Sequence, residues 1–79
     1  MKAIRYTDDA VNDLRRHAGQ EKRITSKIKA YAKTGAGDVK PLSGIEGSRL
    51  RVGSYRVIFI ENEAEIVVVK IGPRSSVYE

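Results

Sequence analysis

The fold is decided by residues 48–79, which read SRLRVGSYRVIFIENEAEIVVVKIGPRSSVYE. This segment contains three runs rich in β-branched and aromatic residues, separated by short turn signals. The first turn is Gly53-Ser54, a Gly-X pair suited to a type II′ hairpin, and the second is Asn62-Glu63. The pattern predicts a three-stranded antiparallel meander.

Side chains alternate along a strand, so the meander has two faces of different chemistry. Leu50 and Val52 point to one face, and Arg49 and Arg51 point to the other. Residues 55–61 are apolar at nearly every position, which places that strand at the centre of the sheet. We expect helices to cover the first face and to leave the second open for three cations, Arg49, Arg51 and Arg56.

A short strand and a helix are expected before the meander. Residues 2–6 alternate polar and apolar side chains, which predicts a short edge strand. Thr7 can cap a helix whose first turn carries carboxylates, at the positive end of the helix dipole. That helix is expected to end at Gly19, with an apolar stripe made of Val11, Leu14 and Ala18.

A second amphipathic helix is predicted from about Gln20 to Lys33, with an apolar face made of Ile24, Ile28, Tyr31 and Ala32. Two such helices joined by a glycine predict an αα-hairpin. Residues 34–38 break the helical pattern, and residues 40–47 are expected to form a loop. The predicted fold class is α+β with the order β-α-α-β-β-β, in which the helical hairpin packs on one face of a small twisted, mainly antiparallel sheet.

Length and composition restrict the class of protein. With 79 residues the chain is expected to form a single domain, residues 1–79. It has no cysteine and one histidine, which argues against disulfides and against a zinc site built from protein ligands. No apolar run reaches the length of a signal peptide or a membrane span, so we expect a cytoplasmic protein. The net charge of +5 and the pI near 9.7 favour polyanionic partners.

Two segments together resemble the RelE/ParE family of bacterial type II toxin-antitoxin toxins: RLRVGSYRVIF at 49–59 and IGPRSSVY at 71–78. The helical hairpin matches that family in length and order, so the resemblance covers nearly the whole chain. It implies the RelE/ParE-like fold and a short cognate antitoxin, whose helix would cover the αα-hairpin or the open face of the sheet. RelE-like members cut mRNA in the ribosomal A site, whereas ParE-like members bind DNA gyrase and poison it.

The resemblance to the ribonuclease members also implies roles for individual residues. Arg56 and Arg74 correspond to arginines that clamp phosphate, and Tyr78 to a tyrosine that orients the 2′-hydroxyl, stacks on a base or transfers a proton. Arg49 and Arg51 correspond to the basic residues of the second strand, which would bind RNA. Lys70 is counted with these RNA-binding cations because it is the only charge on an otherwise apolar strand. Cleavage by an adjacent 2′-hydroxyl requires no metal or other cofactor, and none is expected.

The sequence departs from the ribonuclease pattern at two places. Arginines occupy the second-strand position where some members have a lysine, and arginine is effectively always protonated. Pro73 stands where many relatives have a histidine. A ribosome-dependent endoribonuclease remains the preferred interpretation. The alternatives are a gyrase poison without nuclease activity and an inactive module that only binds.

Each candidate residue also has a structural interpretation. The arginines can form a solvated sheet face, Tyr78 can pack its ring over the sheet, and Lys70 can extend to the rim. His17 fits a surface position in the last helical turn better than a catalytic role. Glu46 is a minor candidate for a general base, because it is the only carboxylate in the loop before the cationic strand.

Overall fold

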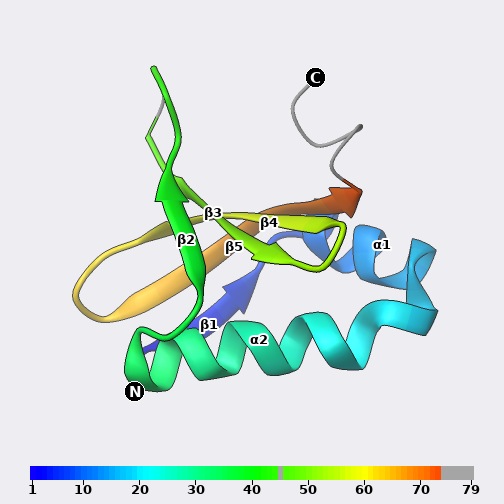
Figure 1. Ribbon diagram of the computed structural model, residues 1–79, viewed down its shortest axis with the longest axis horizontal. Coiled ribbons are helices and arrows are strands. Elements are labelled where there is room, and N and C mark those ends of the chain that lie inside the picture. The colour runs from blue at the N-terminus through cyan, green and yellow to red at the C-terminus, as the bar shows by residue number, and fades with distance from the viewer. Residues whose placement is uncertain (45, 74–79) are drawn as a thin grey trace.

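The computed structural model describes residues 1–44 and 46–73. In chain order the elements are β1 (Ala3–Tyr6), α1 (Asp8–Arg16), the 3₁₀ turn η1 (Ala18–Gln20), α2 (Glu21–Thr34), β2 (Asp38–Pro41), β3 (Ser48–Val52), β4 (Tyr55–Glu61) and β5 (Glu65–Pro73). The strands form one sheet with the order β1-β5-β4-β3-β2 (Figure 1). Only β1 and β5 run parallel.

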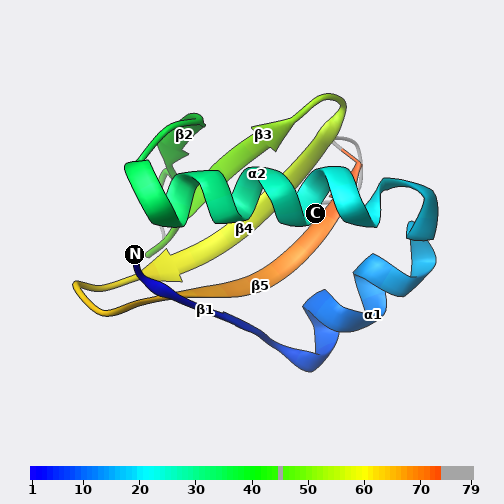
Figure 2. The same cartoon turned by 90° about the horizontal axis from the view of Figure 1, so that it is seen from below.

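Both helices lie on the same face of this sheet, and α2 crosses over its strands (Figure 2). The α+β fold with a helical hairpin on one face of a mainly antiparallel sheet is therefore confirmed, and so is the central position of β4. The core lies between the two layers and consists of Ala10, Leu14, Ile24, Ile28, Ala32, Leu50, Val52, Val57, Phe59, Ile66, Val68 and Ile71. Burying each large aliphatic side chain contributes about 1.5–3 kcal/mol.

The expected loop at residues 40–47 is wrong in its first part, because Asp38–Pro41 forms the edge strand β2. Val39 pairs with Leu50 and packs against the core. Pro41 lacks an N–H, which an edge strand tolerates because one side of its backbone needs no partner. A four-residue strand with one core-facing side chain has too little alternation to be recognised from sequence.

The first helix is shorter than expected and buries a different stripe. It ends at Arg16, and Ala18 is exposed in η1. Leu14 is buried as predicted, but its buried neighbours on α1 are Ala10 and Asp13. The cap at Thr7 is confirmed, because its hydroxyl accepts a hydrogen bond from Ala10 N at 3.2 Å.

Where β1 ends, polar groups of the next segment continue the pairing along the edge of β5. Thr7 N donates to Val68 O at 3.0 Å, and the Thr7 hydroxyl donates to Val69 O at 3.1 Å. Farther along, Asp13 Oδ2 accepts a hydrogen bond from Ile71 N at 2.9 Å. Asp13 is 4% exposed, so this buried carboxylate satisfies a buried backbone donor and fixes α1 to β5.

The pairing of β4 with β5 contains one irregularity. Ile58 pairs with Lys70, whereas the next residue, Phe59, pairs with Val68, so Val69 is an extra, unpaired residue. This is the arrangement of a β-bulge. It brings Val68 and Ile71 to the core face although they are three residues apart.

A second network joins Lys2, which directly precedes β1, to α2 and β4 at the opposite end of the sheet. The Tyr31 hydroxyl donates to Glu61 Oε1 at 2.5 Å, and Lys2 Nζ forms an ion pair with Glu61 Oε2 at 2.7 Å. Burial and the hydrogen bond to Glu61 raise the pKa of Tyr31 to about 12. Burial alone would raise the pKa of Glu61, but hydrogen bonds from Lys2 and Tyr31 hold it below its usual value.

The Tyr31 network predicts a loss of stability in alkali. The folded-state pKa of Tyr31 lies above its unfolded value of 10.0, so its contribution is complete below about pH 10 and is lost as pH rises through about 12. Tyr31→Phe is expected to be less stable than wild type by about 1 kcal/mol at neutral pH. Urea unfolding at several pH values should show this difference shrinking above about pH 10, and a constant difference would contradict the prediction.

The buried carboxylate of Asp13 predicts a second effect on stability. Asp13→Ala leaves the N–H of Ile71 without its acceptor, which is expected to cost about 1–3 kcal/mol of unfolding free energy. Asn12→Ala is the matched control, because Asn12 is exposed on the same helix. Equal urea midpoints for the two variants would show that the hydrogen bond does not stabilise the fold.

Candidate functional site

The sheet face opposite the helices carries two cross-strand rows in which most residues are charged, and we call them the cationic rows. The strand register defines them, because residues paired across neighbouring strands point to the same face. One row runs across β2, β3, β4 and β5 as Lys40, Arg49, Ile58 and Lys70. The second row consists of Asp38, Arg51, Arg56 and Gly72. The predicted cations Arg49, Arg51, Arg56 and Lys70 thus lie on one face, and β2 adds Lys40.

Positive charge dominates the cationic rows, with five cations and one carboxylate. Lys40, Arg51 and Lys70 are exposed, and Arg49 is partly buried. Asp38 approaches Arg51 with an oxygen–nitrogen distance of 4.0 Å, and both side chains are about half exposed, so this pair stabilises little. Arg51 and Arg56 are direct cross-strand partners, and like charges in that position repel. A bound anion would relieve this repulsion.

The expectation that Arg56 lies open to solvent is wrong, although it is on the predicted face. Arg56 is only 2% exposed. It is the second residue of the central strand β4, and its partner on β5 is Gly72, which has no side chain. Its Nη1 donates to Tyr55 O at 3.4 Å, while its buried Nε has no hydrogen-bond partner among the residues that the structure describes. Within residues 1–44 and 46–73, no carboxylate forms an ion pair with this guanidinium.

The other predicted catalytic residues, Arg74 and Tyr78, lie outside the described residues, and their roles stay predictions. Pro73 ends β5 opposite Tyr55 and offers no titratable side chain. Glu46 is exposed, next to the undescribed residue 45. Among the residues that the structure describes, no group of three or more His, Cys, Asp or Glu side chains is placed to hold a metal ion.

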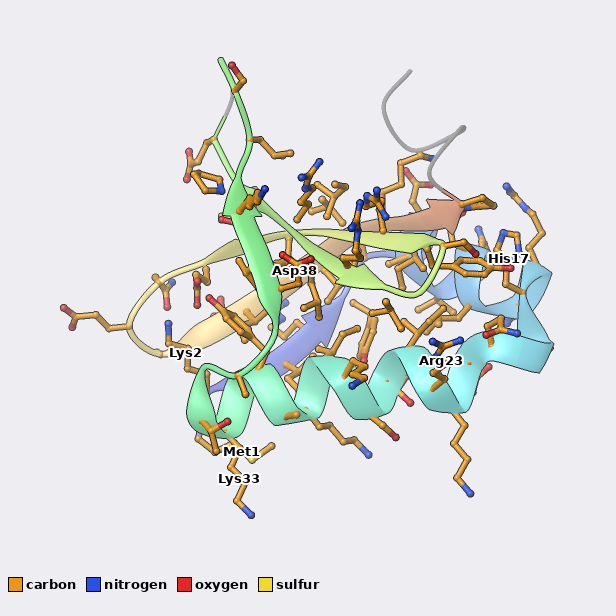
Figure 3. The ribbon with its side chains drawn as sticks, in the orientation of Figure 1. Met1, Lys2, His17, Arg23, Lys33 and Asp38 are labelled. Carbon is orange, nitrogen blue, oxygen red and sulfur yellow. The ribbon has the colours of Figure 1, made fainter. Side chains whose placement is uncertain are left out.

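The sequence did not indicate the contact between His17 and Tyr55. Their rings meet edge to face with centroids 5.0 Å apart, and the Tyr55 hydroxyl lies 3.2 Å from His17 Nδ1. His17 is partly buried rather than a free surface residue. In Figure 3, His17 lies at the same end of the molecule as Arg23, whose side chain extends from α2. The contact fixes the end of α1 against the first residue of β4, immediately before Arg56.

Arg23 approaches the β3–β4 turn closely. A Cβ added to Gly53 would lie 2.9 Å from Arg23 Nη2, and Gly53 has a φ of +60°. No other residue type fits this position without strain. No non-glycine residue in the described part of the chain has a positive φ, so Ser54 has a negative one, as the predicted type II′ turn requires.

A family model described as "ParE toxin of type II toxin-antitoxin system, parDE" matches residues 4–78. The chain belongs to this toxin family. A search of curated proteins finds no match.

No helix in the described ranges is both long enough and apolar enough to cross a membrane.

Solved structures of related toxins have the same fold. The toxin in the RelB–RelE antitoxin–toxin complex of Methanococcus jannaschii is 26% identical, with a TM-score of 0.74 and 94% of each chain covered. The archaeal RelE–RelB complex of Pyrococcus horikoshii gives 22% identity and a TM-score of 0.76, covering 95% of this chain and 97% of the other. The DinJ–YafQ complex of E. coli gives 10% identity and a TM-score of 0.80, covering 99% and 98%. The similarity of this ParE-family toxin to the Pyrococcus horikoshii and E. coli structures concerns the fold alone.

Arg56 is a buried cation at the centre of the site. Its burial predicts that removing the charge stabilises the fold, although the same charge would attract an anion. Arg56→Met replaces a buried, incompletely hydrogen-bonded charge with an apolar side chain, and we expect stability to rise by about 1 kcal/mol or more. Arg51→Met, at the exposed partner position, should change stability by less than about 0.5 kcal/mol. Urea unfolding of both variants tests this, and a destabilised Arg56→Met would show that Arg56 supports the fold.

Proposed function

We propose that this ParE-family toxin is a ribosome-dependent mRNA endoribonuclease that acts in the cytoplasm and is neutralised by a cognate antitoxin. The cationic rows are the observation that carries the proposal. Five cations on one sheet face, one of them a buried guanidinium whose Nε has no acceptor within residues 1–44 and 46–73, suit a chain of negatively charged phosphates.

The reaction proposed is attack of a ribose 2′-oxygen on the adjacent phosphorus. The new bond joins the 2′-oxygen to phosphorus, and the bond from phosphorus to the 5′-oxygen breaks. A base takes the proton of the 2′-hydroxyl and an acid donates one to the leaving oxygen. The products are a 2′,3′-cyclic phosphate and a 5′-hydroxyl, and the step requires no metal or cofactor.

The cationic rows contribute charge to this reaction. The guanidinium of Arg56 offers a planar fork that stabilises the phosphorane, while Arg49, Arg51 and Lys70 bind the RNA backbone. Arg74 and Tyr78 keep the roles implied by the family resemblance, a second phosphate clamp and a proton-transfer or stacking group.

Proton transfer is the weaker part of the proposal. Arginine keeps its proton, and Pro73 has neither a donor nor an acceptor in its side chain. On this proposal Tyr78 is the group that moves a proton, and the rate depends mainly on substrate orientation in the ribosome and on electrostatics.

The second candidate function is poisoning of DNA gyrase without nuclease activity. Two observations favour it: the family model that matches is that of the ParE toxins, and the lysine and histidine of some ribonuclease members are absent. A poison requires a complementary surface and no proton-transfer residue. An inactive binding module is the third alternative.

The antitoxin part of the proposal rests on similar structures. RelE of Methanococcus jannaschii was crystallised with RelB, and YafQ of E. coli with DinJ. The first of these toxins is also 26% identical to this chain over 94% of its length. We therefore propose a cognate antitoxin as the physiological partner.

Mapping new 5′ ends in cellular mRNA after brief induction of the toxin tests the activity. A ribonuclease of this type is expected to cut within translated frames at a fixed position in the codon, leaving 5′-hydroxyl ends. Growth arrest with intact mRNA, DNA breaks and an induced damage response would instead establish the gyrase poison.

RNA binding by the cationic rows predicts a specific salt dependence. Arg51→Ala should weaken binding to a single-stranded RNA oligonucleotide and reduce the slope of log K against log salt by about 0.7–1, the loss of one phosphate contact. Arg15→Ala is the matched control, because Arg15 is exposed on α1, on the opposite face of the sheet. Equal slopes for both variants would place the RNA elsewhere.

A further inference from the structure

The buried Arg56 lies on the open face of the sheet, with a strand pair on either side of it. In both pairs the side chains point to the opposite face, towards the helices, because side chains alternate along a strand. These pairs are Tyr55–Pro73 and Val57–Ile71. The backbone around Arg56 can therefore be held from the helix face, without any contact to the guanidinium itself.

The C-terminal end of α1 contacts both of these pairs. Asp13 Oδ2 accepts a hydrogen bond from Ile71 N at 2.9 Å. Four residues later, the His17 ring meets the Tyr55 ring edge to face, and the Tyr55 hydroxyl lies 3.2 Å from His17 Nδ1. His17 N also donates to Asp13 O at 3.1 Å, so the two contacts come from one turn of the chain. This turn holds β4 and β5 on both sides of Arg56.

Tyr55 lies at an end of the pairing between β4 and β5. It is the first residue of β4 and directly follows the turn at Gly53-Ser54. Its partner Pro73 has no N–H and cannot donate a hydrogen bond to β4. A strand end beside a turn opens more readily than the centre of a sheet. The contact with His17 therefore fixes residue 55 through its side chain.

The orientation of Arg56 depends on residue 55. Arg56 Nη1 donates to Tyr55 O at 3.4 Å, which is long for a hydrogen bond. The guanidinium is buried, and no carboxylate in the described ranges forms an ion pair that would fix it independently of the backbone. A shift of residue 55 would move the carbonyl that the guanidinium contacts.

We propose that Tyr55 and His17 are positioning residues for Arg56: by fixing the first residue of β4 from the helix face, they orient the guanidinium on the open face. The proposal rests on the proposed function in taking Arg56 as the group that stabilises the phosphorane. Neither Tyr55 nor His17 contacts the RNA on this proposal. They act through the placement of a charge, and transition-state stabilisation depends steeply on such placement.

The alternative role of the contact is only to attach α1 to the sheet. Asp13 already attaches this helix through Ile71 N, and Ala10 and Leu14 bury its inner side. If the contact were one more attachment, losing it would lower the stability of the whole fold and would affect Arg56 no more than the core. The two roles thus differ in whether Arg56 opens separately from the core.

Substitutions at both partners distinguish these roles. Tyr55→Phe removes only the hydroxyl. His17→Phe keeps the aromatic contact and loses the hydrogen bond, whereas His17→Asn places a polar atom where Nδ1 lies and retains it. Tyr6→Phe is the matched control, because Tyr6 also packs against the core and lies on β1, away from β4.

The first readout is hydrogen exchange of Arg56 Nε–H, followed by NMR, with its signal identified by its loss in Arg56→Lys. Relative to the backbone N–H of the core residue Phe59, exchange should be about tenfold faster in Tyr55→Phe and His17→Phe than in wild type, because a local hydrogen bond is lost. His17→Asn and Tyr6→Phe should exchange like wild type. Equal acceleration at Arg56 and Phe59, or none at Arg56, would overturn the proposal.

The second readout is mRNA cleavage on programmed ribosomes with the toxin in excess. Tyr55→Phe should lower the maximal rate by about tenfold and leave the half-saturating toxin concentration unchanged, because orientation is lost and binding is not. His17→Asn should cut faster than His17→Phe. A change in the half-saturating concentration alone would contradict the positioning role.

The two readouts also separate this proposal from the proposed function. If the wild-type toxin cuts no mRNA while Arg56 Nε–H exchange responds as expected, the positioning of Arg56 is supported and the ribonuclease is refuted. Slower cleavage with unchanged exchange at Arg56 would overturn the positioning and leave the ribonuclease in place. If Tyr55→Phe fails to fold, His17→Phe and His17→Asn provide the same comparison from the other partner.

Discussion

The register shift between β4 and β5 determines which side chains reach the core and which reach the open face. Without it, Val68 and Ile71 would point to opposite faces, because side chains alternate along a regular strand. Because Val69 is unpaired, the side chains that follow it in β5 point to the opposite faces from those that a regular strand would give them. Val68 and Ile71 therefore both enter the core, and Lys70 lies beside Ile58 in the row of Arg49 on the open face. The hydrophobic core and the cationic rows therefore depend on the same irregularity of the backbone.

The edge of β5 explains how α1 is held near the site. The first half of the edge pairs with β1, and beyond that point Thr7 and Asp13 supply the hydrogen bonds that a neighbouring strand would have made. An edge strand left with unpaired groups is open to association with other chains. Thr7, which caps α1, and Asp13, in the second half of α1, thus satisfy backbone groups on this edge and fix the helix against the strand that carries Lys70.

Local patterns allowed most of the fold to be predicted, and long-range contacts account for the rest. The second helix, the turn at Gly53 and the central position of β4 follow from residues close together in sequence. The strand β2 is too short to show alternation, and an apolar run gives no sign of a bulge within it. Arg56 is buried and pairs with Gly72, sixteen positions later, and this long-range arrangement is not visible in the sequence, which indicated the face of Arg56 but not its exposure. Arg74 and Tyr78 lie outside the residues described.

The outward side chains of β4 change in character along the strand. Arg56 is a buried cation, whereas Ile58, which lies between Arg49 and Lys70 in a cationic row, is apolar. The next outward residue towards the β4–β5 turn is Ile60, which is 37% exposed. Because side chains alternate along a strand, the same strand supplies Val57 and Phe59 to the core and these three residues to the open face. The central strand therefore limits how far the positive charge of the cationic rows extends along the sheet.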